Sequence, residues 1–287
     1  MAYAELTPVS GGPTVHLDAE SDTGLMLGTV AGWYGTPSAK VDMTEMAGGN
    51  GAFSIRDGGI LYSARTVTLG VCASGDTYAE MVKRMDSVGA LSGRMVRLLI
   101  DGDDGATTAT GYVQVEWDEG PMPTMDTGAL TIVCPDPRRY GSAAKTAYMR
   151  PAAQSTGGLL YSSSGVLQLP LAFHGTTEAG SCTATLRNDG TSTAFPVLTT
   201  GGTLRGFSIR DTAGIGTLEY GDTAWPQAPI VIDCLRRTAM CNGVDVTYKL
   251  TRRAFPSVPP GGEITLSCDG DAGSDAYICA SMRDTYI

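Results

Sequence analysis

The stretch CPDPRRYG, residues 134–141, divides the sequence into two halves of similar length. It follows a run of alternating apolar residues that is typical of a β-strand, and it precedes a segment of small residues. Pro135 and Pro137 cannot donate hydrogen bonds to a sheet ladder, and each favours extended geometry in the residue before it. The strand is therefore predicted to end here. At 287 residues, the chain also has about the length of two ordinary domains.

Both halves contain short segments in which apolar and polar residues alternate, bounded by Gly, Asn, Asp or Pro, as in β-strands. In the first half the predicted strands are 25–30, 65–71, 94–100, 112–117 and 129–134. In the second half they are 166–173, 182–187, 203–209, 229–235, 244–250, 263–268 and 276–282. Asn242-Gly243 is a strong hairpin signal, because a type I′ turn needs positive φ at both central residues. Evenly spaced strands without intervening helices predict a β-sandwich or jelly roll in the second half.

Residues 76–91 have helical periodicity instead. Asp76 is the predicted N-cap and Gly89 the predicted end of the helix. The apolar stripe of this helix is interpreted as a core face rather than a ligand site, and consists of Tyr78, Met81, Val82, Met85 and Val88. The predicted fold is mainly β. We expect an N-terminal β-barrel-like or β-sandwich domain with one packed α-helix (1–147), a linker (148–158, within the small-residue stretch 141–158) and a C-terminal β-sandwich (159–287).

The charge of the chain argues against a nucleic-acid-binding function. The net charge is −10 and the sequence pI is about 4.6, whereas phosphate neutralisation needs a basic surface. Residues 1–147 hold 18 acidic and 10 basic side chains, a net charge of −8, and residues 148–287 hold 12 and 10, a net charge of −2. The first residues show no signal-peptide pattern, and no apolar run is long enough to predict a membrane span.

The sequence offers little for catalysis, and we expect no enzyme and no cofactor. The only histidines are His16 and His174, and no nucleophile or phosphate-loop motif is present. Glu116, Asp118 and Glu119 resemble a glycosidase carboxylate set, but a solvated strand end is the simpler interpretation. The Asp-rich stretches 101–105 and 269–275 resemble calcium loops without the full spacing, and we interpret them as turns. The seven cysteines lie singly in strand-like segments, which predicts reduced core thiols rather than a zinc site.

Residues 32–53 form a long glycine-rich stretch with few strand signals. A loop of this length in a compact domain is usually functional or disordered. Two interpretations stay open: an arm that reaches a neighbouring subunit, or an ordinary mobile loop.

Taken in order, the motifs resemble the distal tail protein (Dit) family of bacteriophages with long non-contractile tails, whose members are often described as minor tail proteins. In the first half the resemblance lies in residues 63–71 (SARTVTLGV), residues 77–85 (TYAEMVKRM) and the closing stretch with Pro135, Asp136, Pro137, Arg138 and Tyr140. In the second half it lies in Asn188, Gly190, Phe195, Pro196, Asp233, Asn242, Gly243, Pro260 and Gly261. Two positions depart from the family pattern, namely Glu263 in place of Asn and Asp189 in the middle of an Asn-Pro-Gly turn.

The resemblance implies a structural protein of the virion, located at the tail tip and assembled in the host cytoplasm. The N-terminal domain would form a hexameric ring that continues the tail tube, and the C-terminal domain would be a galectin-like β-sandwich. Its partners would be copies of itself, the tail tube protein, the tail-tip hub and the tape-measure protein. DNA would pass through the channel without specific binding.

Two sets of side chains serve as functional candidates. An acidic lumen would keep the passage of DNA free of adhesion, and the candidate lumen or interface acids are Asp101, Asp103, Asp104, Glu116, Asp118 and Glu119. The alternative function is a carbohydrate-binding tail protein that contacts the host surface through the C-terminal sandwich. Its candidate stacking aromatics are Tyr161, Trp225 and Tyr248, although a core or turn position is the simpler interpretation for each.

Overall fold

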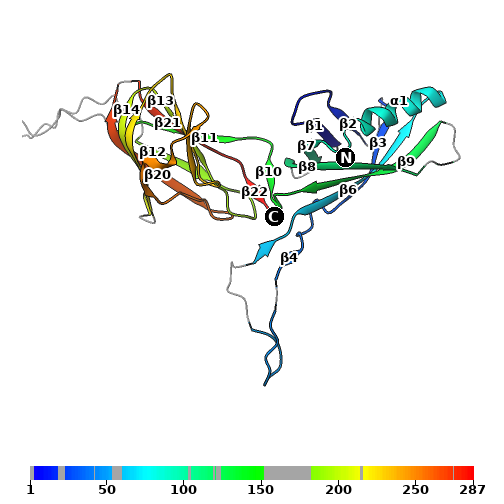
Figure 1. The fold of residues 1–287 in the computed structure, drawn as a ribbon, viewed down its shortest axis with the longest axis horizontal. Helices are drawn as coiled ribbons and strands as arrows, with labels where there is room; N and C mark the ends of the chain where they lie inside the picture. The colour runs from blue at the N-terminus through cyan, green and yellow to red at the C-terminus, as the bar shows by residue number, and fades with distance from the viewer. Residues whose placement is uncertain are drawn as a thin grey trace, which may run out of the picture. The chain divides into compact units, whose positions relative to one another are not determined.

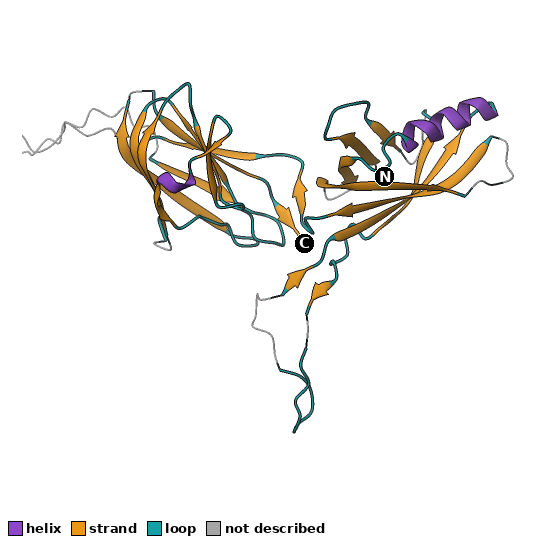
Figure 2. Ribbon diagram, viewed as in Figure 1, coloured by secondary structure: helices purple, strands orange, loops and turns teal. Residues whose placement is uncertain are grey.

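The computed structural model describes residues 3–18, 23–41, 43–53, 60–102, 105–118, 120, 124–151, 182–213, 216–273 and 275–287. Most of these residues form β-strands, and they include one α-helix (Figure 2). This confirms the predicted mainly β class. The chain forms two compact units. The first unit is residues 1–142 together with 285–287, and the second unit is residues 143–284.

The bounds of these units differ from those of the domains expected from the sequence. Lys145–Met149, which overlaps the predicted linker, forms strand β11 and pairs with β21 (Tyr277–Met282) in the second unit. The small residues of this segment hide its alternation, yet Met149 is fully buried in the core of the sandwich. The chain also returns to the first unit at its end, where β22 (Thr285–Tyr286) pairs with β10 (Arg139–Gly141). Residues 152–158 of the predicted linker and the predicted strand 166–173 lie outside the described residues.

The first unit is built on one antiparallel sheet in the order β2-β1-β7-β8-β9-β6-β3 (Figure 1). Its strands are β1 (Tyr3–Pro8), β2 (Val15–Leu17), β3 (Leu25–Ala31), β6 (Arg65–Ser74), β7 (Met95–Gly102), β8 (Gly105–Trp117) and β9 (Met125–Cys134). Alternate residues such as Leu69, Leu98 and Ile132 point to one face and form the core, as period-two patterning requires. Helix α1 (Tyr78–Gly89) contributes Met81 and Val88 to this core.

The helix begins one residue later than expected. Thr77, and not Asp76, is the N-cap, because its hydroxyl accepts a hydrogen bond from the Glu80 backbone N–H (3.3 Å). The Glu80 carboxylate in turn accepts from the backbone N–H of Asp76 (3.1 Å). The Thr-x-x-Glu spacing of a capping box therefore places the helix start. The end of the helix at Gly89 is as predicted.

The second unit is a sandwich of a six-stranded and a five-stranded antiparallel sheet, which confirms the predicted architecture. The first sheet has the order β11-β21-β13-β16-β17-β18, with β13 (Val197–Gly201), β16 (Ile230–Asp233), β17 (Thr238–Cys241) and β18 (Val244–Asp245). The second has the order β12-β20-β14-β15-β19, with β12 (Thr183–Arg187), β20 (Glu263–Ala272), β14 (Leu204–Asp211), β15 (Thr217–Ala224) and β19 (Leu250–Arg253). Inward residues of both sheets share one core, in which the rings of Phe207 and Tyr220 stack with their centroids 5.4 Å apart.

Some strands of the sandwich differ from the sequence prediction. The segment 244–250 was expected as one strand, but it is divided into β18, a short 3-10 helix η1 (Thr247–Lys249) and the start of β19. Asp245 accepts from the Thr247 backbone N–H (2.8 Å), and this local turn competes with the sheet ladder. In the sandwich, strands β13 and β15 were not predicted, and neither were β1, β2 and β10 of the first unit. The hairpin turn at Asn242-Gly243 is present, with φ of 47° and 81°.

The cysteines follow the expectation in part. Cys134, Cys234 and Cys268 are buried core thiols, and burial raises the pKa of Cys134 to about 11. Cys182 is exposed, so the prediction of a core position is wrong for this residue.

Candidate assembly site: the arm and its anchor

The stretch between β3 and β6, residues 32–64, is here called the arm. Strand β4 (Ala39–Lys40) pairs with β5 (Leu61–Tyr62), and Glu45 pairs with Ala52 further along, so the two sides of the arm form an antiparallel ribbon (Figure 1). None of the described residues from 34 to 64 is buried. A two-stranded ribbon of this kind is marginally stable in water by itself.

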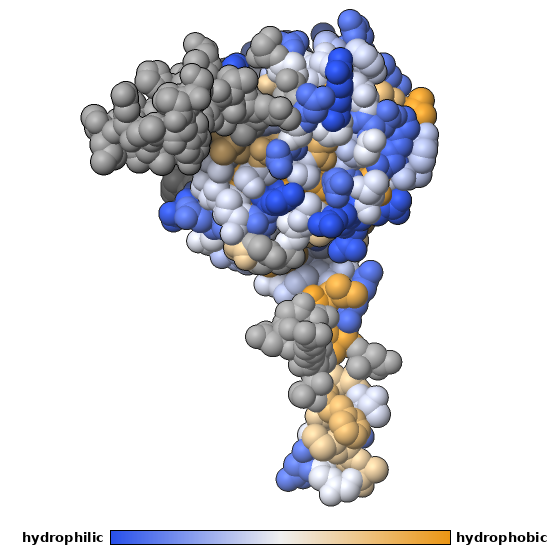
Figure 3. All heavy atoms as spheres, turned by 90° about the vertical axis from the view of Figure 1, so that its left-hand side faces the viewer, coloured by the Kyte–Doolittle hydropathy of each residue, from blue (hydrophilic) through white to orange (hydrophobic). Residues whose placement is uncertain are grey.

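Large apolar side chains are exposed along the arm (Figure 3). The exposed fraction is 60% for Met43, 65% for Phe53 and 69% for Leu61, and Met46 and Ile60 are exposed as well. Contiguous exposed apolar surface costs free energy in water and usually marks a surface that another molecule covers.

The root of the arm is fixed by Arg65, which is 1% exposed. Its Nη1 donates to the carbonyl oxygens of Gly32 (2.8 Å), Trp33 (2.7 Å) and Gly35 (2.7 Å). Its Nε donates to the carbonyl oxygen of Pro137 (2.8 Å). One guanidinium therefore joins the outgoing side of the arm, the start of β6 and the PDPRRYG stretch.

A second buried arginine, Arg139 in β10, lies among aromatic rings. Its guanidinium carbon is 5.7 Å from the ring centroid of Trp33, 5.3 Å from that of Tyr34 and 5.6 Å from that of Tyr286. Trp33 is fully buried, and its Nε1 donates to the Thr107 hydroxyl (3.2 Å). Cation–π contacts stabilise a guanidinium that burial would otherwise penalise. Burial lowers the pKa of Arg139 from its usual value, and it also lowers that of Arg65, with the nearby Arg139 charge adding to the effect.

The remaining residues of the stretch form a structural corner. Asp136 accepts from the backbone N–H of Arg138 (3.1 Å) and from the Tyr140 hydroxyl (2.6 Å). Burial, followed by this hydrogen bond, raises the pKa of Tyr140 to about 12. Pro135 precedes the corner, and β10 then pairs with β8 through Tyr140 and Thr108.

Several motif residues of the second unit hold turns together. Asn188 is fully buried, and its Nδ2 donates to the carbonyl oxygens of Ser192 (2.7 Å) and Pro259 (3.2 Å). Its Oδ1 accepts from the backbone N–H of Gly190 (3.0 Å), and the carbonyl of Gly190 accepts from Gly261 (3.1 Å). These contacts join two loops, because Pro260 and Gly261 belong to the turn before β20.

The other motif residues are also structural. Phe195 packs against the sandwich core, and the Pro196 carbonyl accepts from the Cys234 backbone N–H (3.2 Å). Asp233 accepts from the backbone N–H groups of Leu235 and Arg236, both at 2.9 Å.

Asp189, one of the two departures from the family pattern, acquires partners of its own. Its carboxylate lies 2.7 Å from Lys145 Nζ and 2.7 Å from Arg187 Nε. Lys145 also pairs with Asp284 (2.8 Å), which accepts from the Asp189 backbone N–H (2.9 Å). Hydrogen bonds from the Lys145 and Arg187 side chains lower the pKa of Asp189.

Asp101, Glu116 and Asp118, the candidate acids among the described residues, do not form one cluster. Asp101 lies in β7 beside the start of β8, whereas Glu116 lies near the end of that 13-residue strand. Both point to the sheet face opposite the core. Asp118 follows β8 and accepts from the Thr127 hydroxyl (2.8 Å). Asp103, Asp104 and Glu119 lie outside the described residues.

The two candidate aromatics among the described residues lie outside the strands. Trp225 is 53% exposed in the turn after β15, and Tyr248 is 73% exposed in η1. Lys249 Nζ lies 5.9 Å from the Tyr248 ring centroid and pairs with Asp222 (2.6 Å). Tyr161 lies outside the described residues.

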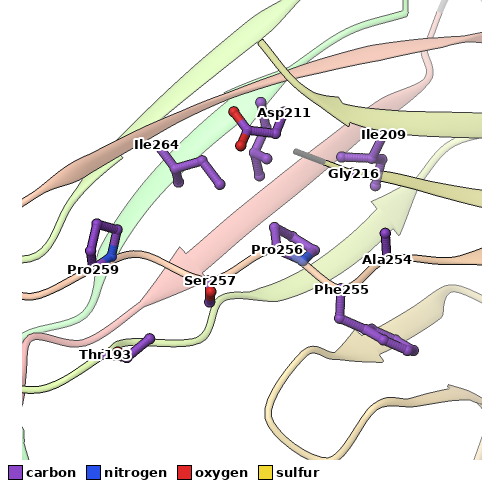
Figure 4. A pocket seen from close by; sticks show the side chains of 11 residues that line it. Thr193, Ile209, Asp211, Gly216, Ala254, Phe255, Pro256, Ser257, Pro259 and Ile264 are labelled. Atoms are coloured by element: carbon purple, nitrogen blue, oxygen red, sulfur yellow. The ribbon is translucent and has the colours of Figure 1, made fainter. Parts of the chain in front are cut away.

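The second unit also has a pocket of about 310 Å³ between the segment 254–259 and strands β14 and β20 (Figure 4). Its walls are mainly apolar and include Ile209, Phe255 and Ile264. Asp211 is the only titratable group among the described residues that line it, and it accepts from the Ala213 backbone N–H (2.9 Å). The pocket can hold a small apolar group, but these walls do not supply the pair of groups that general acid–base chemistry needs.

The described residues contain no group of three or more His, Cys, Asp or Glu side chains placed to hold a metal ion. Of the two Asp-rich stretches, the described residues of 101–105 lie where β7 pairs with the start of β8, whereas Asp269 and Asp271 lie within β20. The second stretch is thus partly strand rather than turn. The helical segments that the structure describes include none with the length and hydropathy of a membrane span.

No family model and no curated protein matches the sequence. Solved structures do. The Dit protein of phage SPP1, described as a paradigm of the hub adsorption apparatus in phages that infect Gram-positive bacteria, matches with a TM-score of 0.63 and 13% identity over 99% of both chains. A chain of the activated phage P2 baseplate with calcium matches with a TM-score of 0.53 and 11% identity over 98% of this chain and 97% of that one. The corresponding baseplate structure with strontium gives a TM-score of 0.52 and 11% identity over 98% of each chain. The chain therefore has the fold of phage distal tail proteins, as the sequence motifs suggested.

The sequence patterns did not single out the residues of the arm root, which are Trp33, Arg65 and Arg139. One signal was available. Arg65 has the same parity in its predicted strand as Val67, Leu69 and Val71, so strand alternation places its charge on the core face. A charged residue at such a position is buried only when it has partners.

Proposed function

We propose that this chain is a structural protein of a phage tail tip, whose first unit assembles with copies of itself into a hexameric ring. The ring joins the tail tube to the tail-tip hub or baseplate and continues the DNA channel around the end of the tape-measure protein. The observation that carries this proposal is the arm, which exposes Met43, Phe53 and Leu61 while buried hydrogen bonds fix its root. The fold shared with phage hub and baseplate chains supports it.

The face of the first sheet opposite the core suits the wall of a channel. Among the described strands, its charged side chains are Glu5, Arg97, Asp101 and Glu116, so acids outnumber bases. Threonines occupy many of the other positions. A hydroxyl-rich acidic wall repels the phosphate backbone, and DNA passes without adhesion. We expect Asp103, Asp104, Asp118 and Glu119 to add to this field in the ring, and a ring structure with a neutral or basic lumen would contradict this expectation.

The proposal is for an adaptor and not for an enzyme. The protein acts in the virion at the tail tip, after assembly in the host cytoplasm. Its partners are further copies of the chain, the tail tube protein, the hub and the tape-measure protein.

The test is the solution mass of the purified chain by size-exclusion chromatography with light scattering, followed by negative-stain imaging. Rings of six subunits support the proposal. If the chain is monomeric alone, the tail tube or hub protein is added, because assembly on a template can require a partner. A chain that stays monomeric with both partners contradicts the ring.

The second candidate is carbohydrate binding by the second unit, favoured by the exposure of Trp225 and Tyr248. Exposed aromatic faces in turns are available for stacking on sugar rings, although the fold alone does not establish binding. A glycan array with the wild type and with Trp225→Ala or Tyr248→Ala tests it. Binding that either substitution abolishes supports this function, and an array without signal contradicts it.

A further inference from the structure

The two arginines at the arm root have unused hydrogen-bonding capacity. Arg65 is 1% exposed and Arg139 is 8% exposed, yet Nη2 of Arg65 and Nε of Arg139 have no hydrogen-bond partner. Buried polar groups are nearly always paired, and an unpaired one needs an explanation. Among the described residues, these two arginines are the only ones with a buried side-chain nitrogen or oxygen that has no hydrogen-bond partner.

Their charges are also not balanced by an acid. Within the described part of the chain, neither guanidinium forms an ion pair; carbonyl oxygens and ring faces are their partners. Asp136, the carboxylate of the PDPRRYG stretch, is engaged by the Tyr140 hydroxyl and the Arg138 backbone N–H instead. Each arginine therefore lacks the anion that usually accompanies a buried cation.

The chemistry that fits is a carboxylate. The guanidinium fork donates in a plane to carboxylate oxygens, and such charge-assisted bonds are stronger than those to carbonyls. A second copy of the chain is a rich source of carboxylates, since residues 1–147 carry a net charge of −8. The apolar surface of the arm begins beside this place, so a second copy that covers the arm also comes near its root.

Tyr34 provides the route of access. Its ring covers the Arg139 guanidinium, with its centroid 5.3 Å from the guanidinium carbon, and the side chain is 59% exposed. An exposed tyrosine of this kind changes rotamer at little cost. Its displacement removes one of the three aromatic rings around the Arg139 guanidinium, and the rings of Trp33 and Tyr286 remain.

We propose that the arm root is a carboxylate-binding site, completed by an Asp or Glu side chain of a second copy when the ring assembles. The inference rests on the proposed ring. It assigns Arg139 a role in joining subunits, in addition to its packing within one.

The test compares Arg139→Gln with the wild type in two measurements: the melting temperature of the dilute monomer and the concentration at which rings dissociate. Arg94→Gln, an exposed arginine in the turn before β7, is the matched control. Because Gln removes a buried charge that has no anion in the monomer, we expect the melting temperature to move by less than about 4 °C. The dissociation concentration should rise by at least about tenfold, because the partner's carboxylate loses its cation. Arg139→Lys, which keeps the charge but not the fork, should give an intermediate rise.

If rings of the wild type and of Arg139→Gln dissociate at the same concentration, the inference is overturned and the proposed function still stands. A wild type that never forms rings overturns both. If Arg139→Gln fails to fold, a ring structure of the wild type decides. A neighbour's carboxylate within about 3 Å of either guanidinium supports the site, and water alone in that position overturns it.

Discussion

The sandwich core and the arm use the same residue types in opposite ways. Phe207 and Leu218 of the sandwich are 2% and 0% exposed, whereas Phe53 and Leu61 of the arm are 65% and 69% exposed. The sandwich has a second sheet to cover the apolar face of the first, so its pattern is satisfied within the chain. The arm has one layer and nothing to cover it within the described residues. The difference separates apolar residues that fold the protein from those that we propose assemble it.

The buried polar groups of the two regions differ in the same sense. Asn188 in the second unit uses both ends of its amide within the chain. Arg65 and Arg139 at the arm root each leave one guanidinium nitrogen without a partner. The turns of the sandwich are thus complete in one chain, and the root of the arm is not.

The largest effect on folding should follow from Trp33→Ala, which removes the buried ring beneath Arg139. We expect a loss of about 3–5 kcal/mol in the free energy of unfolding of the first unit, since a large cavity is left behind. Chemical denaturation followed by circular dichroism measures it. Trp225→Ala is the control, because a half-exposed turn residue should cost about 0.5 kcal/mol or less. Equal losses for the two substitutions would show that Trp33 is not part of the core.

A smaller loss, about 3 kcal/mol, is expected for Asn188→Ala in the second unit. The substitution leaves the buried N–H of Gly190 and the partly buried carbonyl oxygens of Ser192 and Pro259 without their partner. Denaturation that resolves the transition of the second unit tests this. Asn242→Gly is the matched control, since glycine tolerates the positive φ of that turn. A similar small change for both asparagines would mean that the Asn188 network contributes little.

Tyr140→Phe should cost about 1 kcal/mol at neutral pH, because the hydrogen bond to Asp136 is lost. The pH dependence carries more information. The folded state raises the pKa of Tyr140 from 10.0 to about 12, so its contribution is fully present below pH 10 and is lost as the pH rises towards 12. The gap in unfolding free energy between wild type and variant should therefore shrink across this window. A gap that stays constant from pH 8 to pH 12 would contradict the raised pKa.

The smallest effect on folding is expected at the arm. Phe53→Ser combined with Leu61→Ser should change the unfolding free energy of the first unit by less than about 0.5 kcal/mol, because both side chains already face water. The same variant should fail to form rings in light scattering. Lys40→Ser, on the strand opposite Leu61, is the control and should assemble normally. If the double substitution lowers the stability but leaves ring assembly intact, Phe53 and Leu61 contribute to folding and not to assembly.

Local patterning made several features predictable. Alternation in segments such as 65–71 and 129–134 predicted core strands, helical spacing predicted α1, and Asn242-Gly243 predicted its turn. These signals depend on a residue and its near neighbours, which the sequence contains. The sequence also marked residues 32–53 as unusual, because glycines there lack any strand pattern. It did not distinguish a ribbon from a loop, since only the pairing of Ala39 with Tyr62 across the arm decides that.

By itself, then, the sequence determined the mainly β class, the helix, the break after Cys134 and the resemblance to distal tail proteins. Tertiary structure decided what depends on distant partners. It made Lys145–Met149 an edge strand, because β21 lies beside it, and returned residues 285–287 to the first unit. It also brought Trp33, Arg65 and Arg139 together from three separate segments. Burial and charge balance depend on which surfaces meet in space, and no local pattern of residues specifies that.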